Sequence, residues 1–204
     1  MKEQIRCADT KRARRWLAVL LIAASSMAQA ALQGRDLNGD NVVDAFYDTD
    51  LNITWRRNAN LNGLMTWAQA AAWADNSTFG GYTDWRLPTT NTPCLGFNCT
   101  SSEMGHLWYV ELGNLAGDLT PNTGNFVNMQ LYAYWSSTLY AQDPSQAWHF
   151  NIDQGDQDVA GLQNRLYAMS VRDGDVTAVV PEPGTALLLA SLGVLGFVFR
   201  RRQR

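Results

Sequence analysis

The sequence contains few of the side chains from which nucleophilic active sites are built. It has two histidines, His106 and His149, and three cysteines in 204 residues, whereas a catalytic triad needs a histidine beside a serine or cysteine. Both histidines lie in aromatic-rich segments, which favours packed side chains over catalytic ones. A glycine-rich phosphate loop is also missing, because the pair Gly80-Gly81 alone is typical of a turn. An enzyme is therefore not expected.

Basic residues are scarce between the two ends of the chain. Six of the 16 Lys and Arg residues precede residue 31 and four follow residue 199, whereas 16 of the 19 Asp and Glu residues lie between residues 31 and 180. With six positive and 16 negative side chains, that segment has a net charge of −10. This charge repels nucleic acids, anionic lipid surfaces and sulfated polysaccharides, and it favours cations or neutral partners. No nucleic-acid partner is expected.

The first 30 residues have the three parts of a secretory signal peptide in the usual order. A basic segment ending at Arg15 precedes nine apolar residues, 16–24, and Ala28 and Ala30 form an A-x-A cleavage site before Ala31. Nine apolar residues are far fewer than the roughly 20 that cross a bilayer, which argues against a membrane anchor. A cleaved signal peptide over residues 1–30 is therefore predicted, and the protein is expected to be exported.

The C-terminal end combines a Pro-Glu-Pro triplet, an apolar stretch and an arginine cluster. The triplet is Pro181, Glu182 and Pro183, the apolar stretch covers residues 185–199, and four of the last five residues are arginine. These 15 apolar residues make about 22 Å of helix, and snorkelling arginines with local thinning can fit this length to a bilayer. A buried core helix would not explain the arginines. Both ends then obey the positive-inside rule for a single-pass inner-membrane intermediate.

This tail resembles the PEP-CTERM sorting signal of Gram-negative bacteria, with all three parts in the order of that family. The resemblance covers residues 179–204. It implies that an exosortase, a membrane cysteine protease, recognises the tail and cuts near the triplet. It also implies an inner-membrane intermediate that is then moved to the cell surface or the extracellular matrix.

Removal of both ends leaves a segment of the size of one domain, with two cysteines. Cys7 leaves with the signal peptide, and Cys94 and Cys99 remain in a loop rich in Pro, Gly and Asn. In an oxidising compartment this pair is expected to form a local disulfide, which contributes about 2 kcal/mol. Metal binding by the pair is the weaker interpretation, because no histidine lies near it and no second pair completes four ligands.

Hydrophobic periodicity predicts an α+β domain. Leu51, Ile53 and Trp55 alternate with polar residues, which indicates a strand, and Thr66 can cap an alanine-rich helix. Strands are predicted over residues 45–55, 132–138, 146–152 and 167–172, a short extended segment over 82–88, and helices over 67–75 and 101–115. Early helices followed by antiparallel strands are typical of the α+β class.

Seven tryptophans lie between residues 31 and 180, and most of them are expected in the core. If a tryptophan is exposed for contact with a glycan, we expect it to be Trp85, Trp108 or Trp135.

The best candidate metal ligands follow the signal peptide. Oxygen-bearing side chains occur at every second residue from Asp36 through Asn38 to Asp40, and Asp44 follows. This pattern is typical of the opening of an EF-hand calcium loop. The segment departs from the full motif, because the glycine precedes the third acid and Tyr47 occupies the place of the final glutamate. Two interpretations of this segment remain open. It is either a structural or bridging calcium site or a solvated acidic linker.

Several blocks of the central segment together resemble the DUF1566 family, also known as the C-terminal domain of the Legionella collagen-like adhesin. The resemblance spans about residues 42–173, and its most specific parts are Asp-Trp-Arg-Leu-Pro-Thr at 84–89 and Tyr-Trp-Ser-Ser-Thr at 134–138. The blocks are residues 47–55, 64–67, 81–89, 103–109, 134–138, 147–150 and 171–172.

This family is grouped with C-type-lectin-like and formylglycine-generating-enzyme-like folds. The resemblance therefore implies two helices packed against small antiparallel sheets in a domain covering residues 31–178. Cys94 and Cys99 follow the Trp-Arg-Leu-Pro-Thr block directly instead of lying late in the chain, which argues against the activity of those enzymes. From the residues themselves we expect Arg86, Arg172 and the 136–138 hydroxyls to have structural roles.

The expected function is a non-enzymatic extracellular domain that binds glycan or assembles in an exopolysaccharide matrix. The adhesin relatives suggest sulfated glycans, but the charge of −10 favours a neutral sugar or a calcium-bridged polymer. The alternatives are a purely structural surface or biofilm protein, and an enzyme of the formylglycine-generating-enzyme-like fold.

Overall fold

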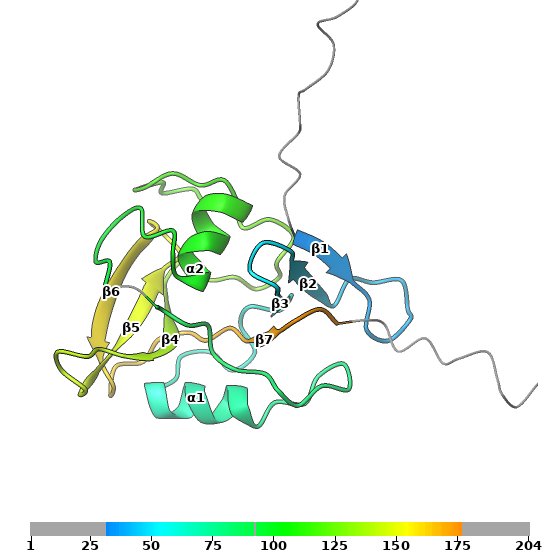
Figure 1. The fold of residues 1–204 in the computed structure, drawn as a ribbon, viewed down its shortest axis with the longest axis horizontal. Helices are drawn as coiled ribbons and strands as arrows, with labels where there is room; N and C mark the ends of the chain where they lie inside the picture. The colour runs from blue at the N-terminus through cyan, green and yellow to red at the C-terminus, as the bar shows by residue number, and fades with distance from the viewer. Residues whose placement is uncertain (1–31, 92, 177–204) are drawn as a thin grey trace, which may run out of the picture.

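The computed structural model describes residues 32–91 and 93–176. It confirms the α+β class, with two short α-helices and two small antiparallel sheets that lie at opposite ends of the domain (Figure 1). The cleavage residues Ala28 and Ala30, the triplet at 181–183 and the apolar tail lie outside the described residues. In the part of the chain that is described, the helices are too short or too polar to cross a membrane.

The first sheet joins the beginning of the domain to its end. It has the order β1-β2-β3-β7 with antiparallel pairs throughout, from strands β1 (Leu32–Arg35), β2 (Ala45–Asp48), β3 (Ile53–Arg56) and β7 (Val171–Asp173). The single strand predicted over 45–55 is wrong, because a tight turn divides it into β2 and β3. Asp48 holds this turn by accepting hydrogen bonds from the N–H groups of Asp50 and Leu51, and Asn52 has a φ of 53°.

The second sheet is a meander of β4 (Ala133–Leu139), β5 (Gln146–Asn151) and β6 (Asp156–Gly161). The strands predicted over 132–138 and 146–152 are confirmed. Strand β6 was not predicted, and of the strand predicted over 167–172 only the last two residues belong to β7. The 136–138 hydroxyls lie within β4 beside a register shift instead of at a turn, although Thr138 does accept a backbone hydrogen bond, from Thr90.

Helix α1 (Trp67–Asp75) has the predicted bounds and a complete capping box. The side chain of Thr66 accepts a hydrogen bond from the N–H of Gln69, and the side chain of Gln69 accepts one from the N–H of Thr66. Ala70 and Ala74 are buried in an apolar cluster, where they pack with Trp135 of β4. The alanines allow the helix to approach the three-stranded sheet closely.

Replacement of Thr66 by alanine is expected to lower the free energy of unfolding by about 1 kcal/mol, because the first turn of α1 loses a side-chain acceptor. Urea-induced unfolding monitored by tryptophan fluorescence measures this change. Thr66→Ser is the matched control, since it keeps the hydroxyl and should remain near wild type. Equal losses for the two variants would contradict a capping role.

The helix predicted over 101–115 is shorter and changes its winding along its length. Residues Glu103–His106 form the α-helix α2, capped by Ser102, and Leu107–Glu111 continue as the π-helix η1. The N–H of Leu112 bonds to the carbonyl of Leu107 at 2.9 Å, five residues back. The helical segment therefore ends before Leu112, and the winding changes at His106.

Two apolar clusters form most of the core. The larger cluster joins the four-stranded sheet to η1 and β5, and it includes Trp55, Trp108 and Phe150. The smaller cluster lies between α1 and β4 and includes Leu87 and Trp135. Aromatic side chains fill much of both clusters, as the tryptophan content predicts.

Candidate functional site

The predicted calcium ligands Asp36, Asn38, Asp40 and Asp44 all lie in the loop between β1 and β2. Each of the three carboxylates accepts at least one hydrogen bond from a backbone N–H group of this loop, and Asp36 accepts three. These bonds satisfy carboxylate oxygens and close the loop on itself. Calcium binding here stays a prediction.

The three tryptophans selected for glycan contact are buried. Trp85 is 1% exposed, and Trp108 and Trp135 are fully buried, so the expectation that one of them contacts a glycan is wrong. Alternation explains the error for Trp135, because polar neighbours in a strand point to the opposite face of the sheet. Its indole N–H donates to the carbonyl of Met65 at 2.9 Å, which gives this ring a structural role.

The disulfide between Cys94 and Cys99 is confirmed, with Cα atoms 5.7 Å apart. It closes the loop that precedes α2. The side chain of Gln157 in β6 donates a hydrogen bond to the carbonyl of Cys94 at 2.6 Å, which connects this loop to the edge of the three-stranded sheet.

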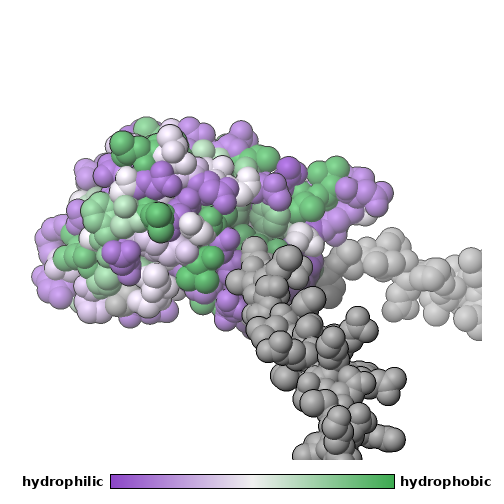
Figure 2. Space-filling model, turned by 90° about the horizontal axis from the view of Figure 1, so that it is seen from above, coloured by the Kyte–Doolittle hydropathy of each residue, from purple (hydrophilic) through white to green (hydrophobic). Residues whose placement is uncertain are grey.

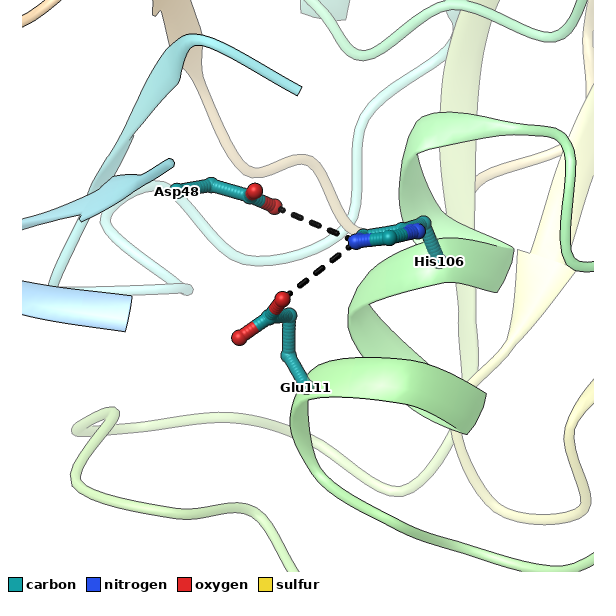
Figure 3. Close-up of side chains that lie close together, drawn as sticks. All are labelled: Asp48, His106 and Glu111. Atoms are coloured by element: carbon teal, nitrogen blue, oxygen red, sulfur yellow. Dashed lines mark hydrogen bonds and ion pairs between the residues drawn. The ribbon is translucent and has the colours of Figure 1, made fainter. Parts of the chain in front are cut away.

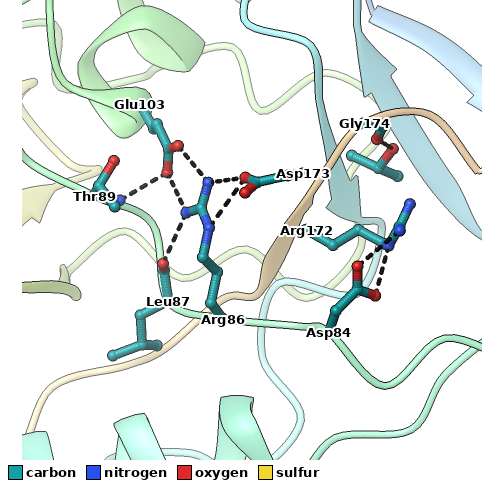
Figure 4. A network of polar contacts seen from close by, with 9 residues as sticks. Asp84, Arg86, Leu87, Thr89, Glu103, Arg172, Asp173 and Gly174 are labelled. Carbon is teal, nitrogen blue, oxygen red and sulfur yellow. Dashed lines mark hydrogen bonds and ion pairs between the residues drawn. The ribbon is translucent and has the colours of Figure 1, made fainter.

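Arg86 and Arg172 form the ion pairs expected of structural residues (Figure 4). The guanidinium of Arg86 donates to both carboxyl oxygens of Glu103, at 2.9 and 2.7 Å, and also contacts Asp173. Arg172 donates to both oxygens of Asp84, at 2.9 and 2.8 Å, and these hydrogen bonds lower the pKa of Asp84. The Asp-Trp-Arg-Leu-Pro block is thereby tied to α2 and β7.

A surface hollow of about 420 Å³ has the composition of a candidate ligand-binding site. It is lined by Leu64, Gln130, Leu131, Tyr132 and Tyr167. Tyr132 is 50% exposed, and its ring meets that of Tyr167 edge to face with centroids 6.0 Å apart. Hydrophobic residues are scattered among hydrophilic ones on the face that Figure 2 displays. At this hollow, three exposed hydrophobic residues lie together, Leu64, Leu131 and Tyr132.

A second candidate site joins the end of β2 to the helical segment. Figure 3 shows the carboxyl groups of Asp48 and Glu111 both directed towards the Nε2 atom of His106. This atom lies 3.3 Å from Oε1 of Glu111 and 4.0 Å from Oδ2 of Asp48. Among the residues that the structure describes, this is the one group of three His, Cys, Asp or Glu side chains arranged to hold a metal ion.

Burial determines the electrostatics of this second site. The side chain of Asp48 is fully buried and that of Glu111 is 1% exposed. Burial, together with the charge of Asp48, raises the pKa of Glu111. The sequence does not predict this site, because Asp48 is distant in sequence and because a histidine and a glutamate five residues apart do not share a face of an α-helix.

His149 is packed, as predicted, and its ring lies edge to face against Trp135. Burial lowers its pKa. His106, in contrast, lies in a polar cluster and not in the purely packed environment that the sequence indicates.

Two family models match the chain. The model described as the Lcl C-terminal domain matches residues 44–172, and the model described as the PEP-CTERM protein-sorting motif matches residues 179–202. No curated protein matches the chain. The first match includes both the Tyr132 hollow and the Asp48–His106–Glu111 cluster, whereas Asp36, Asn38 and Asp40 precede it. Both candidate sites therefore lie within the shared domain.

Proposed function

Because the chain belongs to the family of the Lcl C-terminal domain, we propose that its domain is a lectin-like, non-enzymatic module that binds an extracellular glycan. The PEP-CTERM motif indicates that the protein is exported and that an exosortase sorts it towards the cell surface. In this proposal the glycan belongs to the cell surface or to the surrounding exopolysaccharide matrix.

The observation that carries the proposal is the aromatic hollow. A sugar ring has an apolar face of C–H groups that packs on an exposed aromatic ring, and Tyr132 offers such a ring. Gln130 adds an amide to the same wall. An aromatic surface beside a polar side chain fits a ligand that is apolar on one face and hydroxylated at its edge.

Charge restricts the class of glycan. The described residues include six arginines, no lysine and 16 acidic residues, a net charge of −10. Sulfated or carboxylated polymers would be repelled by this field. A neutral polysaccharide, or an acidic one bridged by calcium at the 36–44 loop, is therefore the proposed ligand.

A purely structural role in the surface layer or matrix is the second candidate. It is favoured by the burial of Trp85, Trp108 and Trp135, since these aromatic side chains support the fold and leave few rings for a ligand. In that case the domain would act through its stability and its attachment.

We expect the purified protein to bind neutral glycans on an array, and Tyr132→Ala to weaken that binding by about 1 kcal/mol, or roughly fivefold in Kd. Phe97→Ala is the matched control, because Phe97 is a similarly exposed aromatic residue in the disulfide loop, 46% exposed. The array is read with calcium and with chelator.

Each outcome of this experiment separates the candidates. Binding that depends on calcium and is lost in Asp40→Asn would support the loop as a bridging site. Equal weakening of glycan binding by Tyr132→Ala and Phe97→Ala would show that the hollow is not the binding site. An absence of binding under both conditions would favour the structural role.

A further inference from the structure

Two buried carboxyl oxygens next to His106 accept no hydrogen bond from any residue in 32–91 or 93–176. They are Oδ2 of Asp48 and Oε2 of Glu111. Removing a carboxylate from water costs several kcal/mol unless a positive charge or several donors replace the water. The Nε2 atom of His106 carries at most one proton, and this single N–H group cannot donate a full hydrogen bond to each of two carboxylates. A further positive partner beside His106 would satisfy both of these oxygens.

The three side chains have the spacing of metal ligands. Their ligand atoms all lie within 4.8 Å of one another, and Nε2 of His106 lies 3.3 Å from Oε1 of Glu111. Two ligands that are each about 2.1 Å from a tetrahedral ion lie about 3.4 Å apart. Side-chain shifts of roughly 1 Å or less would bring all three atoms around one ion.

The π-helix η1 produces this spacing. Residues five apart point to different sides of an α-helix, whereas the wider π turn brings His106 and Glu111 together on one side. Single π turns are uncommon, and they occur frequently at functional sites. The local winding thus aims both side chains at Asp48.

Asp50 lies between the cluster and solvent. Its carboxylate is 55% exposed, and its Oδ2 atom lies 3.9 Å from Nε2 of His106. An ion can enter from this side, and Asp50 or a water molecule can complete the coordination.

We propose that Asp48, His106 and Glu111 bind a divalent transition-metal ion, with Zn²⁺ as the test ion. Imidazole suits Zn²⁺ and its transition-metal neighbours, whereas Ca²⁺ and Mg²⁺ prefer oxygen ligands throughout. One divalent ion balances the two buried carboxylates. It also joins the β2–β3 hairpin to the α2–η1 segment, so this site is structural and does not depend on the proposed glycan binding.

The test uses the full chain, produced with its signal peptide and purified in detergent. After treatment with chelator, equilibrium dialysis against Zn²⁺ with elemental analysis should give one ion per chain and a Kd on the order of 1 µM or tighter. We expect His106→Gln to weaken binding at least about tenfold. Asp40→Asn, in the β1–β2 loop, should bind as the wild type does, and millimolar Ca²⁺ should not displace Zn²⁺.

A second measurement needs no variant. The chain has two histidines, so Zn²⁺ should shift the ring nitrogen resonances of His106 in an NMR spectrum and leave those of His149 unchanged. Absence of stoichiometric Zn²⁺, a shift at His149 alone, displacement by Ca²⁺, or loss of binding in Asp40→Asn with retention in His106→Gln would each overturn the proposal.

Discussion

Replacement of Arg86 by alanine is expected to lower the free energy of unfolding by about 3 kcal/mol. The main cause is Glu103, whose side chain is 12% exposed and would lose the guanidinium that donates to both of its oxygens. Removing one partner of a buried ion pair costs about 3 to 5 kcal/mol. Because Glu103 is only partly buried, we expect a loss at the lower end of this range. Asp173 contributes little, because its side chain is 79% exposed.

Urea unfolding of the purified protein measures this change, and Arg35→Ala is the matched control. Arg35 also donates to both oxygens of an aspartate, Asp175, but that pair lies at the surface, so its loss should cost less than about 1 kcal/mol. The double variant Arg86→Ala/Glu103→Gln should recover part of the stability, since it removes the unpaired charge. Equal effects of Arg86→Ala and Arg35→Ala would contradict this account of the junction.

Replacement of Gly105 by alanine is expected to destabilise the protein by about 2 to 3 kcal/mol. Alanine normally stabilises a helix by about 1 kcal/mol relative to glycine. At this position, however, a Cβ atom would lie 1.8 Å from the carbonyl oxygen of Cys99. The helix or the disulfide loop must move to relieve this overlap, and overpacking of this kind outweighs the gain in helix propensity.

Thermal or urea unfolding tests this prediction with Gly161→Ala as the control, because no atom lies within 4 Å of the Cβ that would be added there. The disulfide supplies a further test. In the reduced protein the loop can move away from α2, so the penalty of Gly105→Ala should become smaller. A stabilised Gly105→Ala variant would be incompatible with the close contact of α2 with this loop.

Local signals in the sequence predict local structure well in this protein. Thr66, Gln69 and the alanine run fix the bounds of α1, because capping and helix propensity involve neighbouring residues alone. The disulfide between Cys94 and Cys99 follows similarly from spacing and compartment.

Errors arise where the same pattern is compatible with two structures. Leu51 continues an apolar alternation into β3, yet it lies in a turn that Asp48 closes. Strand β6 begins Asp-Gln-Asp and therefore has the composition of a turn, and its pairing with β5 decides its conformation. Tertiary pairing, which the sequence does not display, overrides the local preference in both cases.

The candidate sites are the least predictable part of the protein. The cluster brings Asp48 to His106 and Glu111 across a long sequence separation, and the π turn that aligns the latter two has no simple sequence signature. The hollow likewise combines residue 64 with residues 130–132 and residue 167. Each site exists only after distant segments have come together.

The pairing of β3 with β7 has a consequence for the timing of folding during export. Residues Ile53–Trp55 pair with Val171–Asp173, so the four-stranded sheet cannot close until nearly the whole domain has crossed the membrane. Closure of so long a loop is slow compared with local helix formation. We expect the incomplete sheet to keep the chain in a form that can still be threaded through the membrane. The sorting motif begins six residues after β7, at residue 179, so the domain gains its last strand only when the signal for the exosortase is about to reach the membrane.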